Sequence, residues 1–155
     1  MYYNLTEHRN KAFNKFNKLN KKSFLCPALN MEVKFTNEGF SHITYKDKKH
    51  RRSNDEQAVR FACFLSVEEI LRKSHLYQEY RAIETEIKVR KYGQNMKERH
   101  IIEYFGFVAV VEHNNKKDRI RVVVSRKQWD NYVEFLSVVP ARNMIWYRNF
   151  MGPLT

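Results

Sequence analysis

Apolar residues near the start of the chain recur with the period of a helix. Asn4 and Glu7 have the spacing of a capping box, in which two side chains bind free amides at a helix start. The apolar residues then lie three or four positions apart, separated by Lys and Asn: Leu5, Ala12, Phe13, Phe16 and Leu19. This predicts a basic amphipathic helix that ends before Pro27. Such a helix suits a membrane surface or calmodulin, but we favour packing against its own domain.

The next segments predict a strand pair followed by a helix. Residues 31–36 alternate apolar and polar side chains, as a half-buried strand does. Residues 37–39 form a turn signal, so residues 40–45 are expected to pair back as a second strand. Ser53 and Glu56 form a second capping box. A buried helix face follows it at Ala58, Phe61, Ala62 and Leu65, and Ser66 with Glu69 is expected to restart the helix to about Ser74.

The second half of the chain is rich in residues that favour strands. Residues 83–90 alternate and end at a glycine turn, and residues 94–100 are expected to form a polar loop. Residues 101–111 predict a central strand that returns antiparallel over residues 120–124, after a hairpin loop at 113–118.

The last part of the chain predicts one helix and one strand. Ser125 and Gln128 form a third capping box, and one helical face follows at Trp129, Tyr132, Val133 and Leu136. After Pro140, residues 144–147 are expected to add an edge strand.

This order of elements predicts an α+β fold, with N-terminal helices packed on an antiparallel sheet of about four to five strands. The length of 155 residues fits a single domain, 1–155. Within it, residues 1–28 form the basic helix and its connection, and residues 29–150 form the core.

Composition points to a polyanionic partner. The net charge is +12, and aromatic residues make up 14% of the chain. The charge is uneven, because residues 1–53 hold twelve Lys or Arg against four Asp or Glu. A basic cluster of this kind favours nucleic acid, although a basic solvent-exposed surface is the simpler explanation.

Cysteine use and hydropathy bear on localisation. The spacing of Cys26 and Cys63 does not indicate a disulfide bond. Two thiols without an export signal suggest a reducing cytoplasm. No apolar run approaches the roughly 20 residues of a membrane span. We therefore expect a cytoplasmic protein with no membrane partner, while delivery by a larger carrier protein stays open.

The segment 39–52 carries the candidate chemistry. It combines His42 with a loop rich in cations, a pairing that suits RNA cleavage without a metal, because RNA supplies its own 2′-hydroxyl nucleophile. His42 is the expected proton-transfer residue. The alternative is that His42 is structural and hydrogen-bonds the backbone of the sheet. The expected RNA contacts in the loop are Lys46, Lys48, Lys49, His50, Arg51 and Arg52.

Further candidates come from the following helix and the later strands. Arg60 lies within an apolar helical stretch, so its guanidinium is expected either to stabilise the pentavalent phosphorus or to reach solvent from the helix edge. Arg119 and Arg121 share one face of a strand and are expected to bind RNA. Lys127 and Ser137 flank the last predicted helix and are weaker candidates, for RNA binding and catalysis respectively.

Other classes of site find little support. The chain has no Gly-rich phosphate loop and no HExxH motif, and its two cysteines lack zinc-site spacing. We expect no cofactor and no metal, although scattered carboxylates can converge in a fold.

The segment Gly39-Phe40-Ser41-His42-Ile43, the basic loop and the helix with Arg60 resemble a phage-associated branch of the barnase/EndoU/colicin/RelE-like (BECR) ribonucleases. The resemblance spans about residues 30–140. It implies an antiparallel sheet behind N-terminal helices and metal-free RNA cleavage. It further implies a toxin that acts on tRNA or mRNA and is restrained by an acidic antitoxin or immunity protein. His42 would be catalytic, with Arg60 and the segment 135–138, including Ser137, lining the site.

The sequence thus supports three functional hypotheses. The first is a metal-independent endoribonuclease, expected to be a toxin. The second is a non-catalytic nucleic-acid-binding module that uses the same basic surface. The third is a phage or mobile-element accessory protein that docks an acidic partner.

Overall fold

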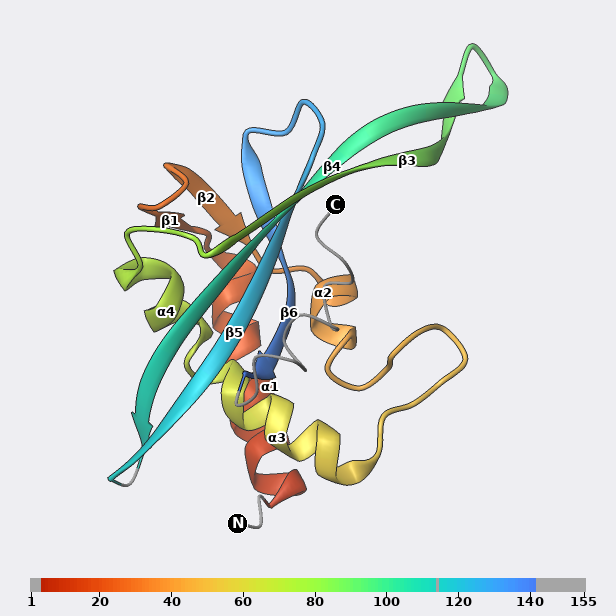
Figure 1. Ribbon diagram of the computed structural model, residues 1–155. Coiled ribbons are helices and arrows are strands. Elements are labelled where there is room, and N and C mark those ends of the chain that lie inside the picture. The colour runs from red at the N-terminus through yellow and green to blue at the C-terminus, as the bar shows by residue number, and fades with distance from the viewer. Residues whose placement is uncertain (1–3, 114, 142–155) are drawn as a thin grey trace.

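The computed structural model describes residues 4–113 and 115–141 of the chain (Figure 1). The helices are α1 (Leu5–Lys21), α2 (Asn37–Ser41), α3 (Asn54–Phe64) and α4 (Val67–Lys73). The strands are β1 (Phe24–Cys26), β2 (Met31–Lys34), β3 (Glu79–Lys91), β4 (Gln94–His113), β5 (Lys116–Lys127) and β6 (Tyr132–Pro140).

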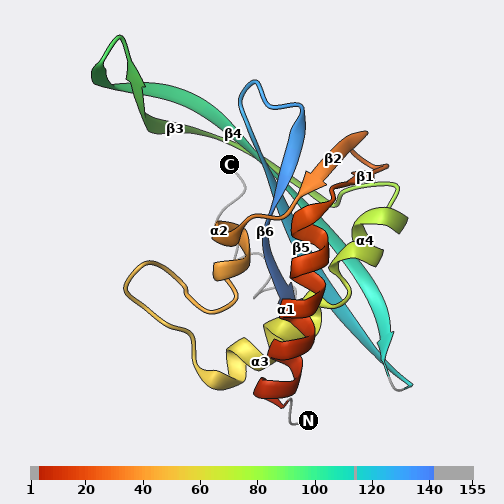
Figure 2. The ribbon, with the colours of Figure 1, turned by 180° about the vertical axis from the view of Figure 1, so that it is seen from behind.

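The strands form one sheet in the order β1-β2-β6-β5-β4-β3. Every neighbouring pair is antiparallel except β2 and β6, which are parallel. Helices α1 and α3 lie across one face of this sheet, as the reverse view shows (Figure 2). The α+β class is therefore confirmed, with six strands in the described residues rather than the expected four to five.

Phenylalanine rings fill the space between the helices and the sheet. Phe16 of α1 stacks on Phe40 of α2 with ring centroids 4.3 Å apart. Phe135 of β6 packs against both Phe35 and Phe64, at 5.4 Å in each case. These contacts join α1, α2, α3 and β6 into one apolar core, which explains why the N-terminal helix packs on its own domain.

The N-cap hydrogen bonds of two predicted capping boxes are present. The Asn4 side chain accepts a hydrogen bond from the Glu7 amide, and the Ser53 side chain accepts one from the Glu56 amide. Helices α1 and α3 begin at these residues because the capping side chains bind amides that have no partner within the helix.

The predicted strand at residues 40–45 is wrong, because α2 ends at Ser41 and residues 42–44 form a turn. The Thr36 side chain accepts a hydrogen bond from the Gly39 amide, so residues 37–39 form the first turn of a helix rather than a hairpin turn. His42 is consequently the residue that ends this helix and does not lie on a strand.

The predicted loop at 94–100 is also wrong. Tyr92 and Gly93 both have positive φ and make the whole turn, so β4 begins directly at Gln94. From Gln94 to His100, β4 pairs only with β3, because β5 ends at Lys127, opposite Ile102. Residues 84–100 therefore extend past the other strands as a two-stranded ribbon, here called the arm (Figure 1).

The predicted helix over residues 129–136 is the third error, since β6 occupies residues 132–140. Gln128 does not cap a helix, because its side-chain oxygen accepts a hydrogen bond from the Ile101 amide. Val133 and Phe135 are buried in the core between β2 and β5, and this tertiary placement decides the conformation. The edge strand predicted at 144–147 lies outside the described residues.

Candidate functional site

The candidate site lies where α2 and α3 pack against the outer edge of β6. β2 pairs with β6 only at residues 132–134, so α2 and α3 cover the rest of that edge. Gly39 lies directly against the carbonyl of Phe135, where a Cβ atom would stand 2.0 Å from the oxygen. Arg60 Nη1 donates to the carbonyl oxygen of Val138 at 3.3 Å. The edge is thereby shielded, and both helices are held against it.

His42 ends α2, the helix that packs on this edge, and is half-buried. Arg52 Nε donates to the His42 carbonyl oxygen at 2.9 Å, which ties the far end of the basic loop to the end of α2. Burial lowers the pKa of His42; Glu38 opposes this shift, and Arg52 and Arg60 add to it. We refer to Glu38, His42, Arg52 and Arg60 as the His42 cluster.

Two guanidinium groups of this cluster also line a cleft of about 500 Å³. Its walls come from Lys46, Arg52, Asp55, Glu56, Val59, Arg60 and Pro140. Burial lowers the pKa of Arg60 to about 10, so the group stays protonated at neutral pH. Burial also lowers the pKa of Arg52, and Glu56 opposes that shift. The cleft is therefore lined by three cations and two carboxylates, Asp55 and Glu56, and Glu56 lies 3.5 Å from Arg52.

The basic loop has an ordered backbone. Tyr45 and Arg51 form a bridge, and the Lys46 amide donates to the His50 carbonyl at 2.9 Å. The Asp47 carboxylate accepts hydrogen bonds from the amides of Lys49 and His50 and contacts His50 Nδ1 at 2.8 Å. Three loop cations are exposed and form no ion pair in the part of the chain that the structure describes: Lys48, Lys49 and Arg51. They are available to phosphate groups, whereas His50 is held by Asp47.

Arg121 is not placed to bind RNA. It is fully buried and its Nε donates to Glu79 Oε1 at 2.6 Å. Gly106 makes this pair possible, because a Cβ atom there would stand 2.3 Å from the same Glu79 oxygen. The pair links β3 to β5 across β4, so Arg121 has a structural role.

Ser137 of β6 is nearly buried and faces away from the phenylalanine core. It is 8% exposed and lies opposite Val123, whereas Phe135 lies opposite Val124. Because adjacent residues of a strand face opposite ways, Ser137 and the core residue Phe135 are on opposite faces of the sheet. No hydrogen bond within the described ranges joins Ser137 to His42 or Arg60.

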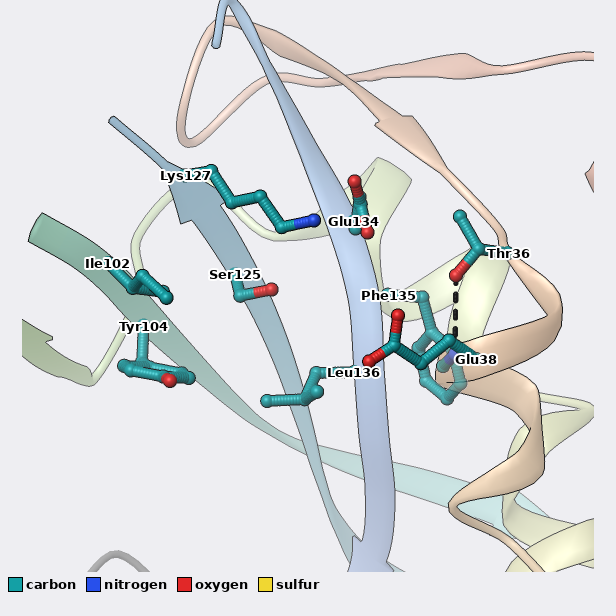
Figure 3. A pocket seen from close by; sticks show the side chains of 10 residues that line it. Thr36, Glu38, Ile102, Tyr104, Ser125, Lys127, Glu134, Phe135 and Leu136 are labelled. Carbon is teal, nitrogen blue, oxygen red and sulfur yellow. Dashed lines mark hydrogen bonds between the residues drawn. The ribbon is translucent and has the colours of Figure 1, made fainter. Parts of the chain in front are cut away.

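The two remaining cations predicted to bind RNA lie apart from each other. Arg119 is exposed on β5 near the β4–β5 hairpin. Lys127 borders a smaller pocket of about 140 Å³ on the sheet, together with Thr36, Ser125 and Glu134. Figure 3 shows the Lys127 side chain reaching across this pocket toward β6. Neither residue takes part in the charge interactions of the His42 ring.

Glu38 is the residue of the cluster that sequence reasoning missed. It precedes His42 by four positions, so both side chains share one side of α2. Its carboxylate turns toward the smaller pocket, beside Leu136 (Figure 3). The signal was present in the spacing, but it has meaning only once residues 37–41 are known to be helical.

The comparisons with known proteins assign a family. The sequence profile described as "large polyvalent protein-associated domain 3" matches residues 4–136. The chain belongs to this family. The comparison with curated proteins and the comparison with solved structures gave no match. The family is phage-associated, so that part of the expected resemblance is confirmed, and the match covers α1 through α4 and most of the sheet.

Two features are absent from the described residues. No helix there is long and apolar enough to cross a membrane. No three His, Cys, Asp or Glu side chains among those residues are grouped so as to hold a metal ion.

Proposed function

We propose that this domain is a metal-independent endoribonuclease whose site is the His42 cluster. The observation that supports this most directly is that Arg52 binds the His42 carbonyl and also lines the cationic cleft with Arg60. Burial, Arg52 and Arg60 lower the pKa of His42. An imidazole that is neutral at pH 7 suits a general base. Guanidinium groups in a cleft suit the charge that develops on a phosphate during attack.

The proposed reaction uses the 2′-hydroxyl of the substrate. His42 takes the hydroxyl proton, and the oxygen attacks the adjacent phosphorus. The bond from phosphorus to the 5′-oxygen then breaks, and that oxygen takes a proton from water in the open cleft. The protonated His42 gives its proton to the hydroxide that is left, which restores the neutral imidazole and the water. The products are a 2′,3′-cyclic phosphate and a free 5′-hydroxyl. Arg52 and Arg60 stabilise the pentavalent intermediate, while Lys48, Lys49 and Arg51 hold flanking phosphates.

The biological setting we propose is that of a toxin acting on cellular RNA, with tRNA and mRNA as the candidate targets. The phage-associated family supports this setting. The same exposed cations would suit an acidic antitoxin or immunity protein, since such a partner competes with RNA for one surface.

The deciding experiment compares His42→Ala with the wild type and with His75→Ala. His75 is exposed and lies in the turn before β3, outside the His42 cluster. Total RNA is incubated with each protein in chelator, and the product ends are identified. We expect His42→Ala to lose about 10²- to 10⁴-fold of the cleavage rate, the usual contribution of a general base. Full activity of His42→Ala, or activity that disappears with chelator, contradicts the proposal.

Binding of RNA without cleavage is the second candidate. It is favoured by the fact that Arg52 and Arg60 each donate to a backbone carbonyl, which gives both residues a structural use. This function predicts salt-sensitive binding and intact RNA after long incubation with the wild type.

A further inference from the structure

The arm is a feature that the proposed site does not use. Its two strands pair only with each other, and residues 91–97 are all exposed. Eight residues of β3, from Glu84 to Lys91, span roughly 25 Å. A two-stranded ribbon alone is only marginally stable in water. A projection of this length therefore suggests a binding element.

Charge along the arm is concentrated at its far end. Residues 88–97 contain four Lys or Arg and no Asp or Glu. Lys88 lies directly opposite Lys97 in the register. Like charges in directly opposed positions destabilise a strand pair. An anionic partner would remove this repulsion.

The ion pairs of the arm leave two of these cations available. Lys97 contacts Glu86 at 3.7 Å, and Lys91 contacts Glu98. Lys88 and Arg90 form no ion pair with any residue that the structure describes. They share one face of β3, about 7 Å apart, which is comparable to the separation of neighbouring phosphates on one nucleic-acid strand.

The apex of the arm presents an aromatic ring. Tyr92 is 97% exposed and has a φ of 54°, with Gly93 at 74° completing the turn. Exposed aromatic rings beside cations stack on bases or pack against sugars. An acidic protein surface could accept both the cations and the ring, so the choice of nucleic acid rests on the proposed function.

We propose that the arm binds a double-helical stem of the RNA whose unpaired strand reaches the His42 cluster. This inference rests on the proposed function for the choice of RNA. Double-stranded RNA is recognised mainly through phosphates and 2′-hydroxyls across a wide, shallow minor groove, which a projecting ribbon can follow. The substrate class is therefore an RNA with a stem next to an unpaired cleavage site.

Binding is tested in a His42→Ala background, so that the RNA stays intact. The probes are an RNA duplex of roughly 20 base pairs, longer than the ~16 that a double-stranded-RNA-binding domain spans, and DNA duplex and single-stranded RNA of equal length. The double variant Lys88→Gln/Arg90→Gln is compared with Lys18→Gln/Lys21→Gln, which removes the same charge from exposed positions of α1.

We expect the arm variant to bind RNA duplex roughly tenfold more weakly. The slope of log affinity against log salt concentration should fall by the amount expected for about two lost phosphate contacts. The α1 variant is expected to stay within about threefold of the parent. Tyr92→Ala is expected to lower affinity without changing the salt dependence. Equal losses in the arm and α1 variants, losses on single-stranded RNA as large as on duplex, or a preference for DNA duplex would overturn the proposal.

Cleavage assays separate this inference from the proposed function. With His42 present, the arm variant is expected to cleave a short unpaired RNA at the wild-type rate and a stem-containing RNA more slowly. If no protein cleaves RNA but the arm variant still loses duplex affinity, the proposed function fails and the arm keeps its role. If cleavage of both RNAs is unchanged by the arm variant, the arm proposal fails alone.

Discussion

Strand β4 passes through two different environments, and their contrast explains much of this protein. Near its middle, Phe105 and Phe107 are buried beneath the helices. In the arm, residues of the same strand pair only with β3 and are mostly exposed. Both parts have the full hydrogen-bond ladder of a strand pair. We call the four helices and the part of the sheet that they cover the body. The helices distinguish the body from the arm, because burial of apolar surface supplies most of the stability.

The two regions also differ in what they can do. The body holds His42, Arg52 and Arg60 in fixed positions through bonds to the backbone. The arm carries exposed cations and an exposed ring at a distance from the body. In the proposed function, the body supplies the reacting groups and the arm extends the binding surface.

The largest effect is expected from Phe135→Ala, in the centre of the body. Phe135 is 1% exposed and packs against Phe35 and Phe64. Removing a buried phenylalanine leaves a cavity and lowers the free energy of unfolding by about 3–5 kcal/mol. Urea unfolding followed by circular dichroism measures this loss. A loss below that of an arm substitution would contradict the division into body and arm.

Gly39→Ala is expected to lower the free energy of unfolding by about 2–3 kcal/mol. The new Cβ atom would meet the Phe135 carbonyl, a backbone atom that cannot rotate away. The counterpart in the arm is Gly93→Ala, where φ is positive but no atom lies within 4 Å. We expect only about 1 kcal/mol there, since the change strains one dihedral angle in open space. Equal losses at the two glycines would show that α2 moves freely.

The pH dependence of cleavage tests the body without changing its packing. Because burial, Arg52 and Arg60 lower the pKa of His42 from 6.5, its base form is already present at pH 7. The rate is therefore expected to fall only as the pH drops below 6.5. Arg52→Gln removes one cation and should raise the pKa of His42, moving this loss of activity to higher pH, while Glu38→Gln should move it lower. Titration of the His42 ring by nuclear magnetic resonance gives the same pKa directly. If neither substitution changes this pKa, His42 lies outside the cluster.

The smallest effect is expected from Ile87→Ala in the arm. Ile87 lies opposite Glu98 on a ribbon with no helix beside it. We expect a change of about 0.5 kcal/mol in the free energy of unfolding, as for surface positions. The same urea titration measures it. A loss of several kcal/mol would mean that the arm is packed in solution.

Parts of the site were visible in the sequence because they depend on near neighbours. His42, the cations of the basic loop and Arg60 lie within one short stretch of chain, and a helix start separates the loop from Arg60. The positions of Arg121 and Ser137 could not be predicted from the sequence. Arg121 is buried because it pairs with Glu79, which lies 42 positions away, and because Gly106 has no side chain to displace that pair. Ser137 faces away from the core because of an irregularity between β5 and β6.

The sequence by itself determined α1 and α3, since their capping residues and apolar spacing act within a few positions of each other. It also determined the antiparallel pairing of β4 with β5, because a short turn joins two runs of strand-forming residues. Only the tertiary structure decided that residues 132–140 form a strand, that residues 37–41 form a helix at its edge, and that β3 and β4 extend as an arm. Those choices depend on distant partners, whose contacts outweigh the small local preferences of each segment.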